Sequence, residues 1–222
     1  MTHLIFVRHG EIKYNLSETY CGQLDCPLSK TGYNQANELM DYILKVNMHI
    51  DEIWSSDLQR ARSTVAPIAK ALSLPVRLHA GLREINCGDF VDNQREYILE
   101  KYAELIEKLN NYNYEAHYPN GECLGDVRKR VLAAIREICA KADGKTVLIA
   151  AHAGTIHLLI REYYASIGEE KPDNISIWNC SLAHFDYSEK KLTYRKIDEI
   201  TCKSYGKDQD KVLQKYGTIL EI

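Results

Sequence analysis

The chain has 222 residues, 45% of them hydrophobic, and its 28 basic and 31 acidic side chains give a formal net charge of -3. This length is at the upper end of the range for one domain and allows a well-buried core. Because the sequence has no long basic block, neither a nucleic-acid surface nor a polybasic membrane patch is expected, and the expected partners are small molecules. Composition indicates nothing about the oligomeric state.

No stretch approaches the apolar length that a bilayer requires, and residues 1–3 lack the basic and apolar regions of a signal peptide. We therefore expect a cytoplasmic protein. The seven cysteines are scattered from Cys21 to Cys202 without a CxxC pair, so neither a disulfide framework nor a zinc site is expected. We expect reduced thiols, and no metal or other cofactor.

The chain begins with a predicted strand, helix and strand. Residues 4–7 form an apolar run that is typical of a buried strand. Apolar side chains then recur at helical spacing over residues 33–44, behind Ser29 and Thr31, either of which can cap the helix. A brief strand is expected at residues 53–54.

A second helix is predicted over residues 58–72. Residues 56–59 have the pattern of a capping box, which would place Arg60 in the first turn. Pro67 lies inside the apolar pattern and predicts a kink or an early end of the helix.

The middle of the chain predicts extended segments and then helices. Residues 76–78 and 82–85 are expected to be extended, and residues 97–109 to form an amphipathic helix. The tyrosine-rich residues 110–118 are expected to be a loop. Apolar steps over residues 124–138 predict a long helix.

Glu122 precedes that long helix and is expected to be structural or to cap its positive end. The last predicted elements are a strand at residues 146–151, a helix at residues 156–164, and a hairpin formed by residues 182–187 and 192–197. The sequence predicts nothing specific after residue 198.

Strands that alternate with helices predict an α/β fold with a mostly parallel central sheet and helices on both faces. Because no linker interrupts the sequence, we expect a single domain over residues 1–222. Residues 86–121 are expected to form a short helical and loop cap.

Two of the predicted strands end on a histidine. Residues 4–7 lead into Arg8 and His9, and residues 146–151 lead into His152. Either histidine alone would more often be structural. The carboxyl ends of parallel strands form the ligand-binding edge of such sheets, so we expect both histidines to face one crevice.

Five motifs in chain order resemble the signatures of the histidine phosphatase superfamily, also called the phosphoglycerate mutase-like family. The resemblance covers roughly residues 3–187. The motifs are residues 8–11 with Asn15 and residues 22–36, residues 55–61, residues 82–88, residues 119–122, and residues 151–152.

The resemblance implies that His9 is a nucleophile that carries a phosphoryl group between two half-reactions. It implies that Glu84 is the general acid and base, and that Arg8, Arg60 and His152 stabilise the phosphoryl oxygens. These residue types suit the chemistry, because a neutral imidazole has a free lone pair and guanidinium groups bind phosphate oxygens in a bidentate way. No metal is implied.

Asn15, Cys21 and Gly22 resemble the family's substrate-facing loop, although Cys21 could equally be a small buried residue. The backbone N–H of Ala153 is expected to join the phosphoryl site. Ala153 stands where the family usually has glycine, so we expect its φ to be negative. Glu11 is expected to be structural or to cap a helix.

Three functions fit the motifs: a phosphomonoesterase, a phosphoglycerate mutase, and a catalytically silent binding protein. Residues 86–120 contain three basic and seven acidic side chains and lack the adjacent arginine pair of the family's mutases. Phosphatase activity is therefore favoured. The sequence leaves the substrate open among sugar phosphates, phosphoglycerates, α-ribazole phosphate and a broad set.

Overall fold

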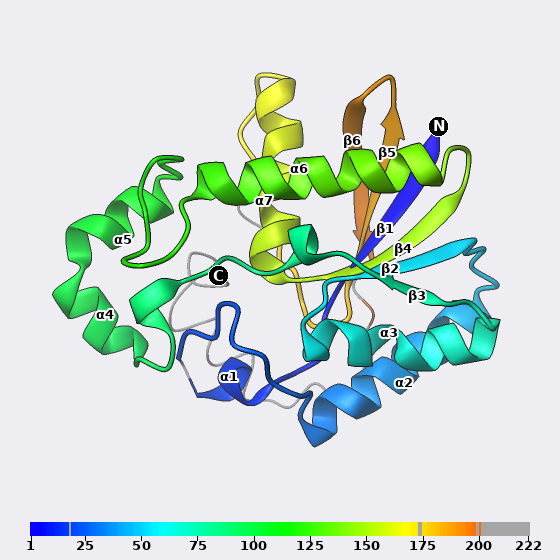
Figure 1. The fold of residues 1–222 in the computed structure, drawn as a ribbon, viewed down its shortest axis with the longest axis horizontal. Helices are drawn as coiled ribbons and strands as arrows, with labels where there is room; N and C mark the ends of the chain where they lie inside the picture. Colours follow the sequence, from blue (N-terminus) through cyan, green and yellow to red (C-terminus); the bar gives the residue numbers. More distant parts are fainter. Residues whose placement is uncertain (18, 173–174, 199, 201–222) are drawn as a thin grey trace.

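A six-stranded sheet lies at the centre of the computed structural model, which describes residues 1–17, 19–172, 175–198 and 200 (Figure 1). The strand order is β3-β2-β4-β1-β5-β6. The strands are β1 (Thr2–Arg8), β2 (Glu52–Ser55), β3 (Val76–Leu78), β4 (Thr146–Ala151), β5 (Leu182–Ser188) and β6 (Lys191–Asp198).

Most of this sheet is parallel, as the sequence predicts. Strand β4 pairs in parallel with both β1 and β2, and β2 pairs in parallel with β3. The predicted late hairpin is confirmed as β5 and β6, which pair antiparallel, and β5 joins the sheet by antiparallel pairing with β1.

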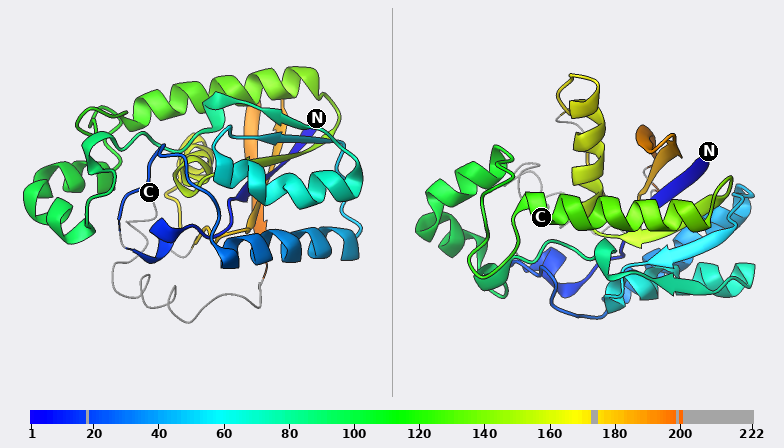
Figure 2. Two further views of the ribbon diagram at one scale, coloured as in Figure 1. Left: turned by 60° about the horizontal axis from the view of Figure 1, so that its bottom comes forward. Right: turned by 45° about the horizontal axis from the view of Figure 1, so that its top comes forward.

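Helices cover both faces of the sheet, with α2 and α3 on one side and α6 and α7 on the other (Figure 1). Beyond the N-terminal end of α6, away from the sheet, lie α4 and α5 (Figure 2). The helices are α1 (Lys13–Leu16), α2 (Lys30–Lys45), α3 (Gln59–Leu72), α4 (Arg95–Lys101), α5 (Ala103–Asn110), α6 (Leu124–Lys141) and α7 (Ala153–Ser166), with 3-10 turns η1 (Ala80–Leu82) and η2 (Gly88–Phe90).

The continuous apolar run of β1 is explained by this two-sided cover. Successive side chains of a strand point to opposite faces. Leu4 and Phe6 pack in the core on the α6 and α7 side, whereas Ile5 and Val7 pack in the core on the α2 and α3 side. Burial of each such side chain stabilises the fold by about 1.5–3 kcal/mol. The predicted α/β fold is thus confirmed.

The structure corrects the expected start of α3. Ser29 does cap α2, because its hydroxyl accepts from the Gly32 N–H. By contrast, α3 has Leu58 at its N-cap without a side-chain cap, so the capping box predicted at residues 56–59 is wrong. Asp25, from a distant loop, instead accepts from the Gln59 N–H at 2.6 Å.

Three further expectations need correction. Of the two outcomes expected at Pro67, the early end does not occur, because α3 continues to Leu72. Of residues 82–85, which are predicted to be extended, Leu82 instead ends the 3-10 turn η1, and the residues after it belong to no strand. The helix predicted over residues 97–109 is divided at Tyr102, whose φ of -125° interrupts the helical backbone.

The described residues contain no helix long and apolar enough to cross a membrane. The end of the predicted single domain, at residues 201–222, lies outside the described residues.

Candidate active site

The ends of β1 and β4 bring the two predicted histidines together. These strands are parallel neighbours, with Arg8 opposite Ala151. The His9 N–H donates to the Ala151 carbonyl at 3.1 Å, and the ring centroids of His9 and His152 lie 5.3 Å apart. The sheet register therefore places both imidazoles at one edge.

One ring nitrogen of His9 is fixed by the next residue. Nδ1 lies 2.7 Å from the carbonyl oxygen of Gly10, which can only accept, so Nδ1 carries the proton of the neutral ring. Burial, and then the nearby Arg60 and Arg8, hold the pKa of His9 well below its usual value. His9 is thus a neutral imidazole at pH 7 with a lone pair on Nε2.

Arg60 is buried in the first turn of α3 and is held by three residues from two segments. Its Nε donates to Nδ1 of His152 at 3.3 Å. Its Nη1 donates to the Leu24 carbonyl at 2.8 Å, and its Nη2 to the Gly22 carbonyl at 2.7 Å. These contacts fix the guanidinium beside both histidines.

Two buried N–H donors at this site have no hydrogen-bond partner among the described residues. They are Nε of Arg8, whose Nη1 donates to the Ile177 carbonyl, and Nε2 of His152. Buried polar groups in folded proteins are almost always satisfied, and donors of this kind suit an anion. The site can therefore accept a phosphoryl group.

Glu84 lies over the start of α7. One carboxylate oxygen, Oε2, accepts from the Gly154 N–H at 3.1 Å, and Oε1 accepts from the Ile85 N–H at 2.9 Å. A Cβ on Gly154 would lie 2.6 Å from Oε1 of Glu84, so glycine is required for this approach. The structure thus connects the predicted Glu84 and the segment after His152.

Asn15 and Gly22, predicted to face the substrate, also support the site. The Asn15 side chain accepts from the Ile12 N–H at 2.9 Å and from Asn179 at 3.5 Å, and Asn179 donates to the His9 carbonyl at 2.7 Å. Gly22 has a φ of +50° and provides the carbonyl that holds Arg60.

Cys21 is half-buried, and its Sγ lies 3.7 Å from the Sγ of Cys26. Ala153 is the first residue of α7 and is not among the residues with positive φ, as expected.

Two acidic residues outside the predicted site have structural partners. Glu11 accepts from the Ser29 hydroxyl at 2.5 Å. Glu122 does not cap α6, because Asp126 accepts from the Cys123 N–H there. Instead, Glu122 pairs with Arg130.

Sequence reasoning missed Asn179 and Arg130. Asn179 precedes β5 without any motif, and Arg130 is one of several cationic residues on α6. The sequence around these two residues has no pattern that indicates their role at the site.

A group of potential metal ligands occurs elsewhere in the described part of the chain. Ligand atoms of His117, Cys123 and Asp126 lie within 4.8 Å of one another. The Asp126 carboxylate already accepts from Cys123 at the positive end of α6, which opposes a cation.

The sequence model of the histidine phosphatase superfamily (branch 1) matches residues 4–200. The chain belongs to the histidine phosphatase superfamily. It is thus an enzyme of the histidine phosphatase type, and its relatives have phosphatase and mutase names.

"Uncharacterized phosphatase PhoE" of Bacillus subtilis (strain 168) is 30% identical over 191 residues, which cover 86% of this chain and 91% of PhoE. "Probable phosphoglycerate mutase GpmB" of Shigella dysenteriae serotype 1 is 28% identical over 189 residues, which cover 85% of this chain and 86% of GpmB.

Solved structures of other proteins share the fold. "Mycobacterial hydrolase 1" matches with a TM-score of 0.76 at 25% identity, covering 89% of this chain and 96% of that one. The phosphoglycerate mutase from Bacillus anthracis str. Sterne matches with a TM-score of 0.75 at 23% identity, covering 87% of this chain and 91% of that one.

Proposed function

We propose that this histidine phosphatase is a metal-independent phosphomonoester hydrolase that acts on small phosphorylated metabolites through a phosphohistidine on His9. The observation that carries the proposal is the neutral His9 imidazole beside buried donors of Arg8 and His152 that have no hydrogen-bond partner in the part of the chain that the structure describes. A transferring phosphoryl group spreads negative charge over three oxygens, and these donors with the charge of Arg60 would stabilise it.

In the first half-reaction, Nε2 of His9 attacks phosphorus in line while the bond to the ester oxygen breaks. Glu84 protonates the departing alkoxide, which leaves as an alcohol. His152 donates from Nε2 to a phosphoryl oxygen, as does the backbone N–H of Ala153. The role of Glu84 is supported by its position over the start of α7, through the Gly154 contact.

In the second half-reaction, a water molecule attacks the phosphohistidine. Glu84 takes a proton from the water as the P–N bond breaks, and inorganic phosphate leaves. His9 returns to its neutral form, in which the Gly10 carbonyl again selects Nδ1 for the proton.

We propose that residues 86–121, which include α4 and α5, form a cap that helps to select the organic part of the substrate together with the loop of Asn15, Cys21 and Gly22. Residues 86–120 have seven acidic and three basic side chains. This excess of negative charge disfavours a mutase, in which a phosphorylated intermediate has to reorient over the site. A phosphoglycerate mutase is the second candidate, because GpmB relatives have that name.

Phosphate release from p-nitrophenyl phosphate in excess chelator tests the proposal. The wild type should release phosphate and form an acid-labile phosphoprotein, and His9→Ala should do neither. His49→Ala is the control, since His49 is exposed and contacts Asp51. Equal activity of wild type and His9→Ala would reject the nucleophile, whereas phosphoglycerate isomerisation without phosphate release would favour the mutase.

A further inference from the structure

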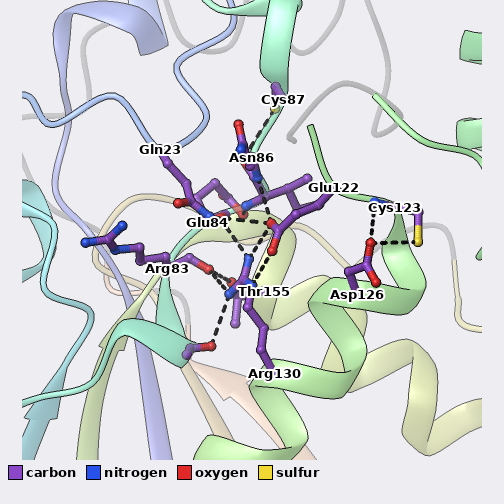
Figure 3. A network of polar contacts seen from close by, with 12 residues as sticks. Gln23, Arg83, Glu84, Asn86, Cys87, Glu122, Cys123, Asp126, Arg130 and Thr155 are labelled. Carbon is purple, nitrogen blue, oxygen red and sulfur yellow. Dashed lines mark hydrogen bonds and ion pairs between the residues drawn. The ribbon is translucent and has the colours of Figure 1, made fainter. Parts of the chain in front are cut away.

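We propose that Arg130 and Glu122 are positioning residues for Glu84. They bind the irregular loop that contains Glu84 and hold this loop against α6. The inference rests on the proposed function, since it takes Glu84 as the group that transfers the proton. Figure 3 shows the network, in which Arg130 reaches from α6 to the loop and meets Glu122 there.

Arg130 directs its whole guanidinium group to this loop. Nε and Nη2 bind the two carboxylate oxygens of Glu122 at 2.7 and 2.9 Å. Nη1 donates to the carbonyls of Arg83 at 2.7 Å and Gly81 at 3.1 Å, and Nη2 donates to the carbonyl of Glu84 at 2.9 Å. All five N–H groups of the side chain thus have an acceptor.

Glu122 extends the same network to the other side of Glu84. Its Oε2 accepts from the Asn86 N–H at 2.9 Å and from the Gln23 side chain at 3.4 Å. Gln23 also donates to the Glu84 carbonyl at 2.9 Å. The backbone is therefore held before, at and after Glu84.

The loop needs such support because it has no regular secondary structure of its own between η1 and η2. The Glu84 carboxylate depends on its backbone to stay 3.1 Å from the Gly154 N–H. A displacement of about 1 Å at a reacting group can cost on the order of 100-fold in rate. A lysine could not replace the planar fork of Arg130, since it offers a single point charge.

The side chains of Arg130 and Glu122 are each 20% exposed, so solvent and salt screen this ion pair less than a pair on the surface. Arg128 provides a matched control on the same helix. Its Nε lies 2.6 Å from a carboxylate oxygen of Glu162, and the Arg128 side chain is 46% exposed. Glu162 lies on α7 rather than on the Glu84 loop.

The test uses the leaving-group dependence of kcat/KM, which reports the first half-reaction. An alkoxide needs protonation as it leaves, whereas p-nitrophenolate needs little. We compare glycerol phosphate with p-nitrophenyl phosphate for the wild type, Arg130→Met, Glu122→Gln and Arg128→Met, with Glu84→Gln as the reference for lost proton transfer.

Arg130→Met should lower kcat/KM for glycerol phosphate by about 10- to 100-fold and for p-nitrophenyl phosphate by less than about 3-fold, in the direction of Glu84→Gln. Glu122→Gln should show a smaller shift of the same sign, and Arg128→Met none. A parallel loss on both substrates, or an unchanged ratio, would overturn the positioning role.

Circular dichroism melting shows whether Arg130→Met is folded at the assay temperature. If it is not, Arg130→Lys, which keeps one charge but not the fork, carries the same test with the same expected change in ratio. A wild type without phosphohistidine would overturn the proposed function and this inference with it. A wild type that forms phosphohistidine, with an Arg130 variant of unchanged ratio, would overturn the positioning role alone.

Discussion

Arg60 Nε donates a hydrogen bond to Nδ1 of His152 at 3.3 Å, and this contact decides which nitrogen of His152 carries a proton. A guanidinium can only donate, so Nδ1 accepts and the proton of the neutral ring is on Nε2. That N–H is buried and has no partner among the described residues. Arg60 therefore presents His152 as a donor to an anion.

Substitution of His152 by asparagine or by glutamine should distinguish the roles of its two ring nitrogens. Asparagine places its amide near Nδ1, while the longer glutamine can place an N–H near Nε2. We expect His152→Asn to lower kcat for p-nitrophenyl phosphate by about 100-fold or more, as for loss of a donor to a developing charge, and His152→Gln to lose less. Steady-state kinetics measures both, and equal losses would reject the donor role.

Stability should depend on pH through His9 and His152. Burial, and next the charge of Arg60, lowers the pKa of both well below the ordinary value of about 6.5 that applies to the unfolded chain. As the pH falls below about 6.5, the unfolded chain binds protons that the folded protein does not. The unfolding free energy should therefore fall, by up to about 1.4 kcal/mol per pH unit for each histidine.

Urea denaturation between pH 7.5 and 5.5 measures this slope. His9→Asn removes one of the two groups, so its slope should be smaller than that of the wild type. A variant with the wild-type slope would show that other groups dominate the pH dependence.

The sequence predicted the site best where covalent order and strand geometry dictate position. His9 and His152 each follow an apolar run, and parallel strands place such ends at one edge. Arg60 does lie in the first turn of α3, as predicted, although the capping box on which that prediction rested is absent. Its guanidinium, however, holds the carbonyls of Gly22 and Leu24, a tertiary contact without any sequence pattern.

The failures have the same cause. The capping box expected before Arg60 was wrong because Asp25, far away in the chain, satisfies the Gln59 N–H. The irregular backbone at Glu84 could not be foreseen, since its hydrogen-bond partners come from Arg130 and from Glu122. Local propensity describes a segment's own hydrogen bonds but not those supplied by another element.

Ala153 should be tolerated at the start of α7, although the family usually has glycine there. Its backbone is helical, so Ala153→Gly should leave kcat/KM within about 2-fold and lower the unfolding free energy by about 0.5–1 kcal/mol through chain entropy. Urea denaturation and steady-state kinetics on one preparation provide both values. A 10-fold rise in kcat/KM would contradict this expectation and show that the methyl group obstructs the phosphoryl site.

Gly154→Ala should separate activity from stability. The added Cβ would lie 2.6 Å from Oε1 of Glu84, so the carboxylate must move away from the Gly154 N–H. Alanine is favoured over glycine in a helix by about 1 kcal/mol, which offsets the steric cost, and we expect little change in Tm. The value of kcat/KM for glycerol phosphate should fall by about 10-fold or more, since Glu84 leaves its position for proton transfer.

In a Glu84→Gln background, Gly154→Ala should cost little further activity, because both changes remove the same interaction. Additive losses in the double variant would show that Gly154 acts on the reaction independently of Glu84.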